Sequence, residues 1–217
     1  MRRILLAAFV AVGFAAGSGA ASAVDQPPFE ATISRIDGET RAVMKGSSWH
    51  KGCPVGFAQL RLIRLMYWGF DREAHHGLLV VHRRWSDDIV TVFRRIYRER
   101  FAIRRVRLVD RYGGDDRRSM RADNTSAFNC RYVAGTTTWS QHAYGRAIDV
   151  NPVENPFVDG SHVSPRKGRR YADRTRERRG MIFERDDVWR GFRRIGWEWG
   201  GTWTGAQDYQ HFSANGR

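Results

Sequence analysis

The chain has 217 residues, which is enough for one domain with a buried core, and it carries a formal net charge of +14. Arginine supplies most of this charge, because the sequence holds only three lysines, Lys45, Lys51 and Lys167. Such a charge favours polyanionic surroundings, either nucleic acid or an anionic polymer of the cell envelope. A protein made mainly of transmembrane helices is excluded, because no apolar run after the N-terminal segment is long enough to cross a bilayer.

The first 23 residues have the pattern of a secretory signal peptide. Arg2 and Arg3 precede the apolar stretch 4–16, which is too short to span a membrane comfortably. Residues 21–23, Ala-Ser-Ala, then fit a small-x-small cleavage motif. We therefore expect residues 1–23 to be removed, leaving a secreted protein in the periplasm or the extracellular wall, without stable membrane insertion. An uncleaved membrane anchor is the alternative. Export argues against nucleic acid as a partner and favours an anionic envelope polymer.

Two cysteines, Cys53 and Cys130, are the only ones in the chain. In an exported protein they can form a single disulfide. The closed loop would be long, so the stabilisation could approach roughly 4 kcal/mol in the chain-entropy treatment. Two buried free thiols are the alternative.

The chain after the cleavage site begins with a segment of low predicted order. Residues 24–49 contain two prolines, two glycines and a serine pair, and we predict an extended, partly disordered lead-in. The folded domain is expected to begin at residue 50. Residues 57–70 (FAQLRLIRLMYWGF) are predicted to form a helix, because their apolar residues recur at helical spacing and Gly69 can end it.

A strand and a helix are predicted next. Residues 77–85 (GLLVVHRRW) form a β-rich run that predicts a strand. Ser86 then fits a helix N-cap, with two aspartates in the first turn. The helix is expected to bury a stripe formed by Ile89, Val92, Phe93, Ile96 and Tyr97. Residues 104–110 alternate and predict another strand, and residues 112–126 are rich in turn formers.

The C-terminal third mixes a long loop with regular elements. Residues 158–180 carry eight basic and three acidic side chains and are expected to be a solvated surface loop, with a loop that flanks the binding cleft as the alternative. Residues 185–197 predict a helix capped by Asp186, and residues 197–203 and 209–213 predict closing strands. The irregular alternation predicts an α+β fold with a small, mainly antiparallel sheet and flanking helices.

The segment TWSQHAYGRAIDV, residues 138–150, carries His142 and Asp149. Fully extended, it would hold these two residues about 23 Å apart, whereas ligand atoms of one zinc ion lie about 2.0–2.2 Å from it. A metal site therefore requires the chain to fold back, and Gly145 offers the backbone freedom for that turn. Beyond the turn, Ala147 and Asp149 share one face of a strand.

A catalytic zinc site needs a third protein ligand. His211 stands out, because Asp208 lies three residues before it and its carboxylate could act as a general base without ligating the metal. The motifs His-Glu-x-x-His and Gly-x-Ser-x-Gly are both absent. Taken alone, the pair of His142 with Asp149 and the pair of Asp208 with His211 are each more often structural.

Taken together, the motifs resemble a known family. The pattern Ser-x-His-x-x-Gly-x-Ala-x-Asp over residues 140–149 resembles the signature of the D-alanyl-D-alanine metallopeptidases. These include the vancomycin-resistance carboxypeptidases and the L-alanyl-D-glutamate endopeptidases of phage endolysins. GWEWGGTW…DYQHF, within residues 196–212, resembles their closing segment with its acid-x-x-His pair. The resemblance covers about residues 50–213 and implies a hedgehog/D,D-peptidase-like fold, with residues 50–217 as the zinc peptidase domain.

The resemblance also implies roles for individual residues. It makes His142, Asp149 and His211 the ligands of a Zn²⁺ cofactor. It makes Asp208 the catalytic carboxylate, a general base that accepts a proton from the attacking water. It places Arg131 in the catalytic site as a substrate-binding arginine, for which a structural or surface arginine is the alternative.

Three further residues complete the predicted site. Ser140 matches the signature serine and is expected to contact substrate or to support the site. Tyr144 is expected to wall the cleft as a substrate-binding residue, with core packing as the alternative. Glu198 in GWEWGG is a rival candidate for the general base.

The function implied by the resemblance is hydrolysis of stem or cross-bridge peptides of peptidoglycan, by an exported enzyme of the D-alanyl-D-alanine carboxypeptidase type. An L-alanyl-D-glutamate endopeptidase and a non-catalytic, zinc-containing envelope-binding domain like the hedgehog signalling domain are the alternatives. Peptidoglycan peptides are the expected partners, anionic envelope polymers are compatible, and the protein is expected to be a monomer.

Overall fold

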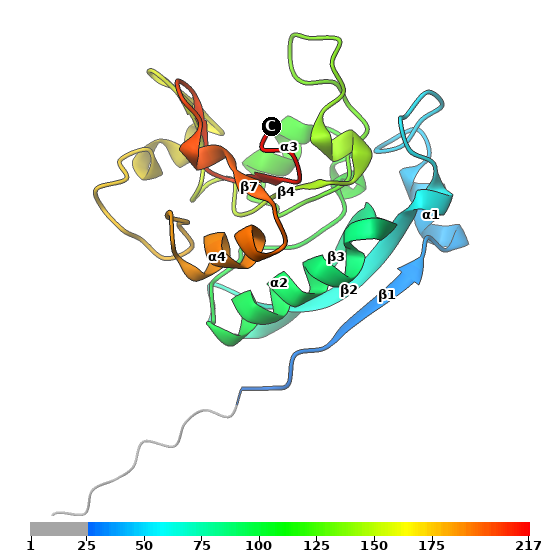
Figure 1. Ribbon diagram of the computed structural model, residues 1–217, viewed down its shortest axis with the longest axis horizontal. Coiled ribbons are helices and arrows are strands. Elements are labelled where there is room, and N and C mark those ends of the chain that lie inside the picture. The colour runs from blue at the N-terminus through cyan, green and yellow to red at the C-terminus, as the bar shows by residue number, and fades with distance from the viewer. Residues whose placement is uncertain (1–25) are drawn as a thin grey trace, which may run out of the picture.

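The computed structural model describes residues 26–217, and Figure 1 shows its elements in chain order. The predicted signal peptide lies outside the described residues. Within residues 26–217, no helix has the length and apolar character needed to cross a membrane. The structure contains three small antiparallel sheets and a few helices, so the fold class is α+β, as predicted.

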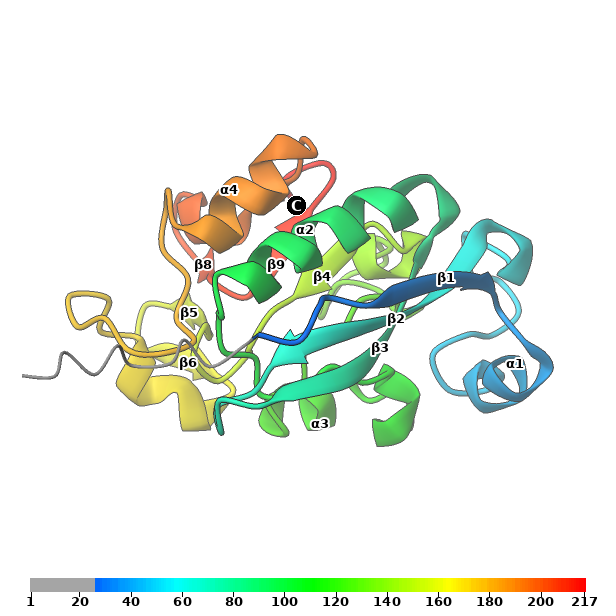
Figure 2. The same cartoon turned by 90° about the horizontal axis from the view of Figure 1, so that it is seen from below.

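The largest sheet contains β1 (Ala31–Arg35), β2 (Leu60–Trp68) and β3 (Ala74–His82), in that order. The long helix α2 (Ser86–Arg98) packs along this sheet and buries the predicted apolar stripe. Figure 2 shows α2 lying between the sheet and α4 (Asp187–Arg194), and α2 contacts both. The predictions of a strand near 77–85 and of the following helix are confirmed, although the helix N-cap is Trp85 rather than Ser86.

The prediction of a helix over residues 57–70 is wrong, because most of this segment forms the central strand β2. Its two faces enter different clusters of the core. Ile63 and Leu65 pack in the cluster under α2, while Leu60 and Leu62 pack in a second cluster on the other side. A strand that is buried on both faces shows a nearly continuous apolar run, which periodicity does not separate from a buried helix.

The prediction of an extended lead-in over residues 24–49 is also wrong in part. β1 is an edge strand whose register places Ala31 opposite Leu65 of β2. Helix α1 (Gly38–Met44) follows, capped by Asp37, whose carboxylate accepts a hydrogen bond from Thr40 N at 2.7 Å. The side chains of β1 are largely exposed, so its stability comes from backbone pairing that the local sequence does not display.

The strand predicted over residues 104–110 does not form. The segment is held instead by asparagine side chains, because Arg104 N donates to Asn151 Oδ1 and Arg107 N donates to Asn124 Oδ1, each at 3.0 Å. The segment therefore obtains its backbone hydrogen bonds from these side chains and from single contacts with β3 and Thr125, without forming a continuous strand pair. The turn-rich segment that follows includes the short helix α3 (Asp116–Arg121).

Two further sheets build the C-terminal half. One has the order β4 (Ala147–Asp149), β9 (His211–Ser213) and β7 (Glu198–Trp199). The other has the order β6 (His162–Ser164), β5 (Phe157–Asp159) and β8 (Gln207–Asp208). The predicted loop over residues 158–180 thus contains most of a hairpin and a 3-10 helix, Arg166–Tyr171.

Helix α4 and the closing strands agree with the predictions. Asp186 caps α4 by accepting a hydrogen bond from Trp189 N at 2.7 Å. Phe192 of α4 stacks on Phe212 of β9, with ring centroids 4.1 Å apart. This aromatic contact ties the helix to the sheet that carries His211 and so holds that sheet against the main core.

Cys53 and Cys130 are joined by a disulfide. The bond connects the segment before β2 to the segment that runs towards residues 131–140. Disulfides persist in oxidising environments such as the outside of the cell, and they are rare where thiols are kept reduced. This cross-link indicates an extracellular environment.

Candidate metal centre

A tight turn positions the first two candidate ligands. Ser140 begins the 3-10 helix Gln141–Tyr144, and its Oγ accepts a hydrogen bond from His142 N at 3.3 Å. Gly145 ends the turn with φ +65°, and its backbone lies so close to β3 that an added Cβ would be 2.6 Å from His82 N. Only glycine fits this left-handed, crowded position. The chain then reverses into β4, as the sequence predicted.

The register of two strands brings in the third candidate ligand. β4 and β9 are antiparallel, and Asp149 lies directly opposite His211. Side chains of directly opposed residues lie on the same face of a sheet, about 4.5–5.5 Å apart at Cβ. A shift of register by one residue would move the imidazole to the opposite face.

The three side chains converge on one point. His211 Nδ1 lies 2.9 Å from Asp149 Oδ1, and His142 Nε2 lies 3.2 Å from Asp149 Oδ2. The two imidazole nitrogens, His142 Nε2 and His211 Nδ1, are 3.3 Å apart. All three residues are buried, and their donor atoms lie within 4.8 Å of one another.

The remaining ring nitrogens are held by backbone carbonyl groups. His142 Nδ1 lies 2.5 Å from Ala127 O, and His211 Nε2 lies 3.1 Å from Arg217 O. An N–H that donates to each carbonyl leaves His142 Nε2 and His211 Nδ1 as lone-pair donors towards Asp149. Metal-binding histidines usually have such partners, which fix the tautomer and the ring orientation. Two imidazoles and one carboxylate, with the second nitrogens occupied, fit a catalytic zinc ion that keeps an open position.

Electrostatics favour an ionised carboxylate at the centre of the cluster. Burial by itself would raise the pKa of Asp149, but the adjacent imidazoles of His142 and His211 hold it well below its usual range. Burial would likewise lower the pKa of His211, and the hydrogen bond and charge of Asp149 raise it above its usual value. The carboxylate therefore provides negative charge in the metal-binding form.

Asp208 lies on β8, close enough to this cluster for the charge of Asp149 to act on its carboxyl group. Burial, and then the negative charge of Asp149, raise the pKa of Asp208 to about 6. Its Oδ1 atom is buried and has no hydrogen-bond partner among the described residues. Gly200 leaves room for the backbone of Asp208, because a Cβ at position 200 would lie 2.6 Å from the carbonyl oxygen of Asp208. A carboxyl group with a raised pKa and a free oxygen is suited to proton transfer near neutral pH.

The structure places Arg131 next to the turn but in an ion pair. Ser140 N donates to Arg131 O at 3.0 Å, so the two residues are neighbours through the backbone. The guanidinium of Arg131 contacts Asp116 of α3 at 2.9 Å. The local sequence gave no sign of this partner, because Asp116 lies in the turn-rich segment and meets Arg131 only in the tertiary structure.

The other predicted site residues separate into two groups. Ser140 is buried and supports the turn. Tyr144 is half-buried against the cluster that includes Leu60, and Arg146 lies over its ring at 4.4 Å, so its contacts are those of a packing residue. Glu198, the rival base, has an exposed side chain that faces Arg193.

Three features near the ligands were not in the predicted site. The carbonyl groups of Ala127 and Arg217, which hold the imidazoles, carry no sequence signal because any residue has a carbonyl. The rings of Tyr132 and Trp139 stack 4.0 Å apart on the arm between Arg131 and Ser140. Trp139, directly before the signature serine in sequence, was the available sign of this stacked pair.

Comparison with known proteins bears on the same segment. Residues 134–214 match the family described as D-alanyl-D-alanine carboxypeptidase. No curated protein and no solved structure matches the chain. The matched segment contains all three clustered side chains and Asp208, whereas Arg131 and the first sheet lie outside it. Residues 134–214 are thus similar to the D-alanyl-D-alanine carboxypeptidase family of peptidases.

Proposed function

We propose that this protein is a zinc-dependent peptidase, exported from the cell, that hydrolyses stem or cross-bridge peptides of peptidoglycan in the manner of a D-alanyl-D-alanine carboxypeptidase. One observation carries the proposal: His142, Asp149 and His211 converge, and Asp208, which has a buried carboxyl oxygen, is close enough for the charge of Asp149 to raise its pKa. The disulfide between Cys53 and Cys130 supports export.

In this proposal, His142, Asp149 and His211 hold the metal. When bound, a zinc ion supplies Lewis acidity and lowers the pKa of a coordinated water towards about 7. Asp208 takes the proton of the attacking water on its free carboxylate oxygen and passes it to the departing amine. The backbone carbonyls of Ala127 and Arg217 keep both imidazoles in the ligating tautomer throughout.

Arg131 is proposed to hold the carboxylate of the substrate. Its planar guanidinium suits a carboxylate, and its present partner is itself a carboxylate, that of Asp116. A substrate carboxylate would replace or share that contact. This role would favour cleavage of the last residue of a peptide, which is carboxypeptidase action.

The experiment is mass spectrometry of muropeptides after incubation with the protein, with and without a zinc chelator. Chelator-sensitive loss of a terminal D-alanine supports the proposal. Chelator-sensitive cleavage within the stem instead identifies an endopeptidase. If no bond is cleaved by zinc-loaded protein, the peptidase proposal is refuted and a non-catalytic zinc-containing domain is favoured.

A further inference from the structure

A basic groove lies on the part of the molecule formed by the β2–β3 turn, the segment 104–107 and the residues after α3. It consists of two adjoining depressions of about 430 and 440 Å³, which share Arg104 and Arg105 in their walls. We call it the arginine groove, and its basic residues are Arg104, Arg105, Arg107, Arg121, Lys167 and Arg170.

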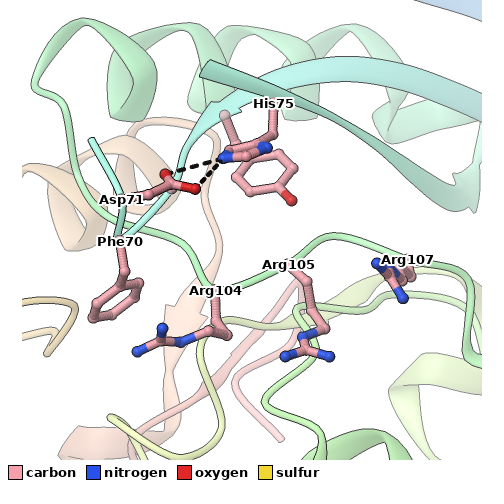
Figure 3. Close-up of a pocket in the computed structure, with 8 residues that line it drawn as sticks. Phe70, Asp71, His75, Arg104, Arg105 and Arg107 are labelled. Carbon is pink, nitrogen blue, oxygen red and sulfur yellow. Dashed lines mark hydrogen bonds and ion pairs between the residues drawn. The ribbon is translucent and has the colours of Figure 1, made fainter. Parts of the chain in front are cut away.

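Figure 3 shows the first depression. Arg104, Arg105 and Arg107 project from one extended segment, and the pair of Asp71 and His75 lies across from them. His75 Nε2 contacts Asp71 Oδ2 at 2.9 Å, so this carboxylate is already engaged by the imidazole. The arginine wall therefore retains its excess positive charge.

Among the described residues, five of the six cations form no ion pair with an acidic side chain, and one of these five, Arg170, is held by a hydroxyl group instead. Among residues 26–217, Arg105, Arg107, Arg121 and Lys167 take part in no ion pair. The Nε atom of Arg105 is buried and donates to no acceptor in that part of the chain. A buried donor without an acceptor is costly and rare in a folded protein. An anionic oxygen bound in the groove would satisfy it.

The other two residues, Arg104 and Arg170, are held in place by neighbouring side chains. Arg104 contacts Asp123 at 3.5 Å and Glu154 at 3.6 Å, and its guanidinium lies 3.8 Å from the centre of the Phe70 ring. Arg170 donates to Tyr171 Oη at 2.7 Å. The groove thus combines two fixed cations with four that remain available to a ligand.

We propose that the arginine groove binds a polyol-phosphate chain, a phosphodiester polymer of the cell envelope. Successive phosphates would occupy the two depressions, with Arg104 and Arg105 between them. Guanidinium groups pair with phosphate oxygens through two parallel hydrogen bonds, which makes arginine the preferred residue for repeated phosphates.

The aromatic residues of the groove distinguish this ligand from a nucleic acid. Binding of single strands relies on open aromatic faces for base stacking. Here His75 stacks on Tyr67 at 5.5 Å, and Arg104 covers Phe70. Each ring already has a partner, so the groove offers phosphate contacts without stacking platforms.

A membrane surface fits the groove less well. The large hydrophobic side chains that are exposed in the described residues are Ile33, Val43, Tyr132 and Val133, and none of them lines the groove. Insertion into a lipid interface depends on apolar side chains beside the basic ones. A recessed, basic groove suits a flexible chain that can enter it.

The groove also has a defined position relative to the metal centre. Arg121 is the last residue of α3, and Asp116, the first, contacts Arg131. A helix of this length spans about 9 Å at 1.5 Å per residue. If the proposed peptidase function holds, a bound envelope polymer would keep the metal centre near the wall peptides.

The experiment measures binding of a synthetic oligo(glycerol phosphate) by isothermal titration calorimetry, at about 50 and about 200 mM salt. The test variant is the double substitution Arg105→Ala and Arg107→Ala. The matched control is Arg190→Ala with Arg194→Ala, two exposed arginines of α4 outside the groove. Circular dichroism verifies that both variants fold. Peptide hydrolysis is not the readout, so failure here leaves the proposed peptidase function intact.

We expect the test variant to lose affinity by about tenfold or more and to show a shallower salt dependence, because phosphate contacts have been removed. The control should bind like the wild-type protein. Equal loss of affinity in both variants would refute binding in the arginine groove, since it would mean that the polymer responds only to the net charge of the protein. Equal affinity for glycerol 3-phosphate would refute the two-phosphate arrangement. Tighter binding of an oligonucleotide of equal charge, or of phosphatidylglycerol vesicles, would refute the polyol-phosphate assignment.

Discussion

At the scale of single residues, the candidate metal centre depends on two imidazoles and a carboxylate that come from two separate segments of the chain and are in contact in space. Asp149 is the common partner, because His142 and His211 each contact a different oxygen of its carboxylate. A buried carboxylate between two imidazoles is an unusual feature for a core, and a bound cation would stabilise it.

Removal of a ligand is expected to abolish metal binding. His142→Ala and His211→Ala should each lower zinc affinity by more than about 100-fold, because even loss of a partner outside the ligand set costs 10- to 100-fold. Metal analysis by mass spectrometry, after dialysis against a weak chelator, measures this directly. His76→Ala, which changes an exposed histidine, is the control and should retain zinc. Full zinc content in His142→Ala would refute the ligand set.

Asp208 is expected to act on the reaction and not on metal binding. Asp208→Asn should retain zinc and lower kcat by about 10²- to 10⁴-fold, the usual contribution of a general base. Steady-state kinetics on a D-alanine-terminated peptide measure it. Glu198→Gln is the control, because Glu198 is exposed and faces Arg193. If Glu198→Gln were the inactive variant, the base would have been assigned wrongly.

Arg131 is expected to recognise the terminal carboxylate. Arg131→Ala should raise KM by about 10- to 100-fold, since hydrogen bonds to charged groups contribute about 1.5–3 kcal/mol. A peptide with an amidated C-terminus should be cleaved poorly by both proteins, with no further loss in the variant. Arg118→Ala, an exposed arginine of α3, is the control. An unchanged KM would remove Arg131 from the site.

At the scale of elements, a turn and a strand pair assemble the centre. The 3-10 helix Gln141–Tyr144 and the turn at Gly145 return the chain to β4, and the pairing of β4 with β9 sets Asp149 opposite His211. The sequence could predict the turn, because glycine at a fold-back has a local cause. It could not predict the register, because pairing partners 62 residues apart leave no local pattern.

The turn can be tested without touching a ligand. Gly145→Ala should destabilise the protein by more than about 1–2 kcal/mol, the cost of a left-handed backbone for alanine, because the added Cβ also meets His82 N. Gly135→Ala is the matched control, since Gly135 has a similar φ of +76° with open space around it. Chemical denaturation gives both values, and zinc affinity should fall only in the Gly145 variant. Equal effects would mean that the close approach to β3 is unimportant.

At the scale of the whole molecule, the long-range contacts decide which charges are buried. Arg104, for example, contacts both Asp123 and Glu154. Burial, and then the neighbouring Asp123, raise the pKa of Glu154 to about 8. At neutral pH this carboxyl group is therefore largely protonated in the folded protein and ionised in the unfolded chain.

Stability should depend on pH through this group. The pKa of Glu154 in the folded protein exceeds the unfolded value of 4.5. The contribution of Glu154 to the free energy of unfolding is therefore fully present below pH 4.5, and it is lost as the pH rises towards 8. Glu154→Gln, which keeps an acceptor for Tyr171, should remove this contribution. The difference in Tm between the two proteins, followed from pH 5 to about pH 9, should grow in favour of the variant. A constant difference would refute the raised pKa.

The sequence by itself determined which residues are candidates for the metal centre and where the chain turns between the first two of them, because residue type and short spacing are local properties. It also determined α2 and α4, whose stripes and caps are local. The tertiary structure decided that residues 60–68 form a strand buried on both faces, that β1 joins its edge, and that Arg131 meets Asp116. It also decided the register that brings His211 to Asp149 and the groove that gathers cations from three segments. These features arise from contacts between distant segments, whose energies are set by burial and pairing rather than by the neighbours along the chain.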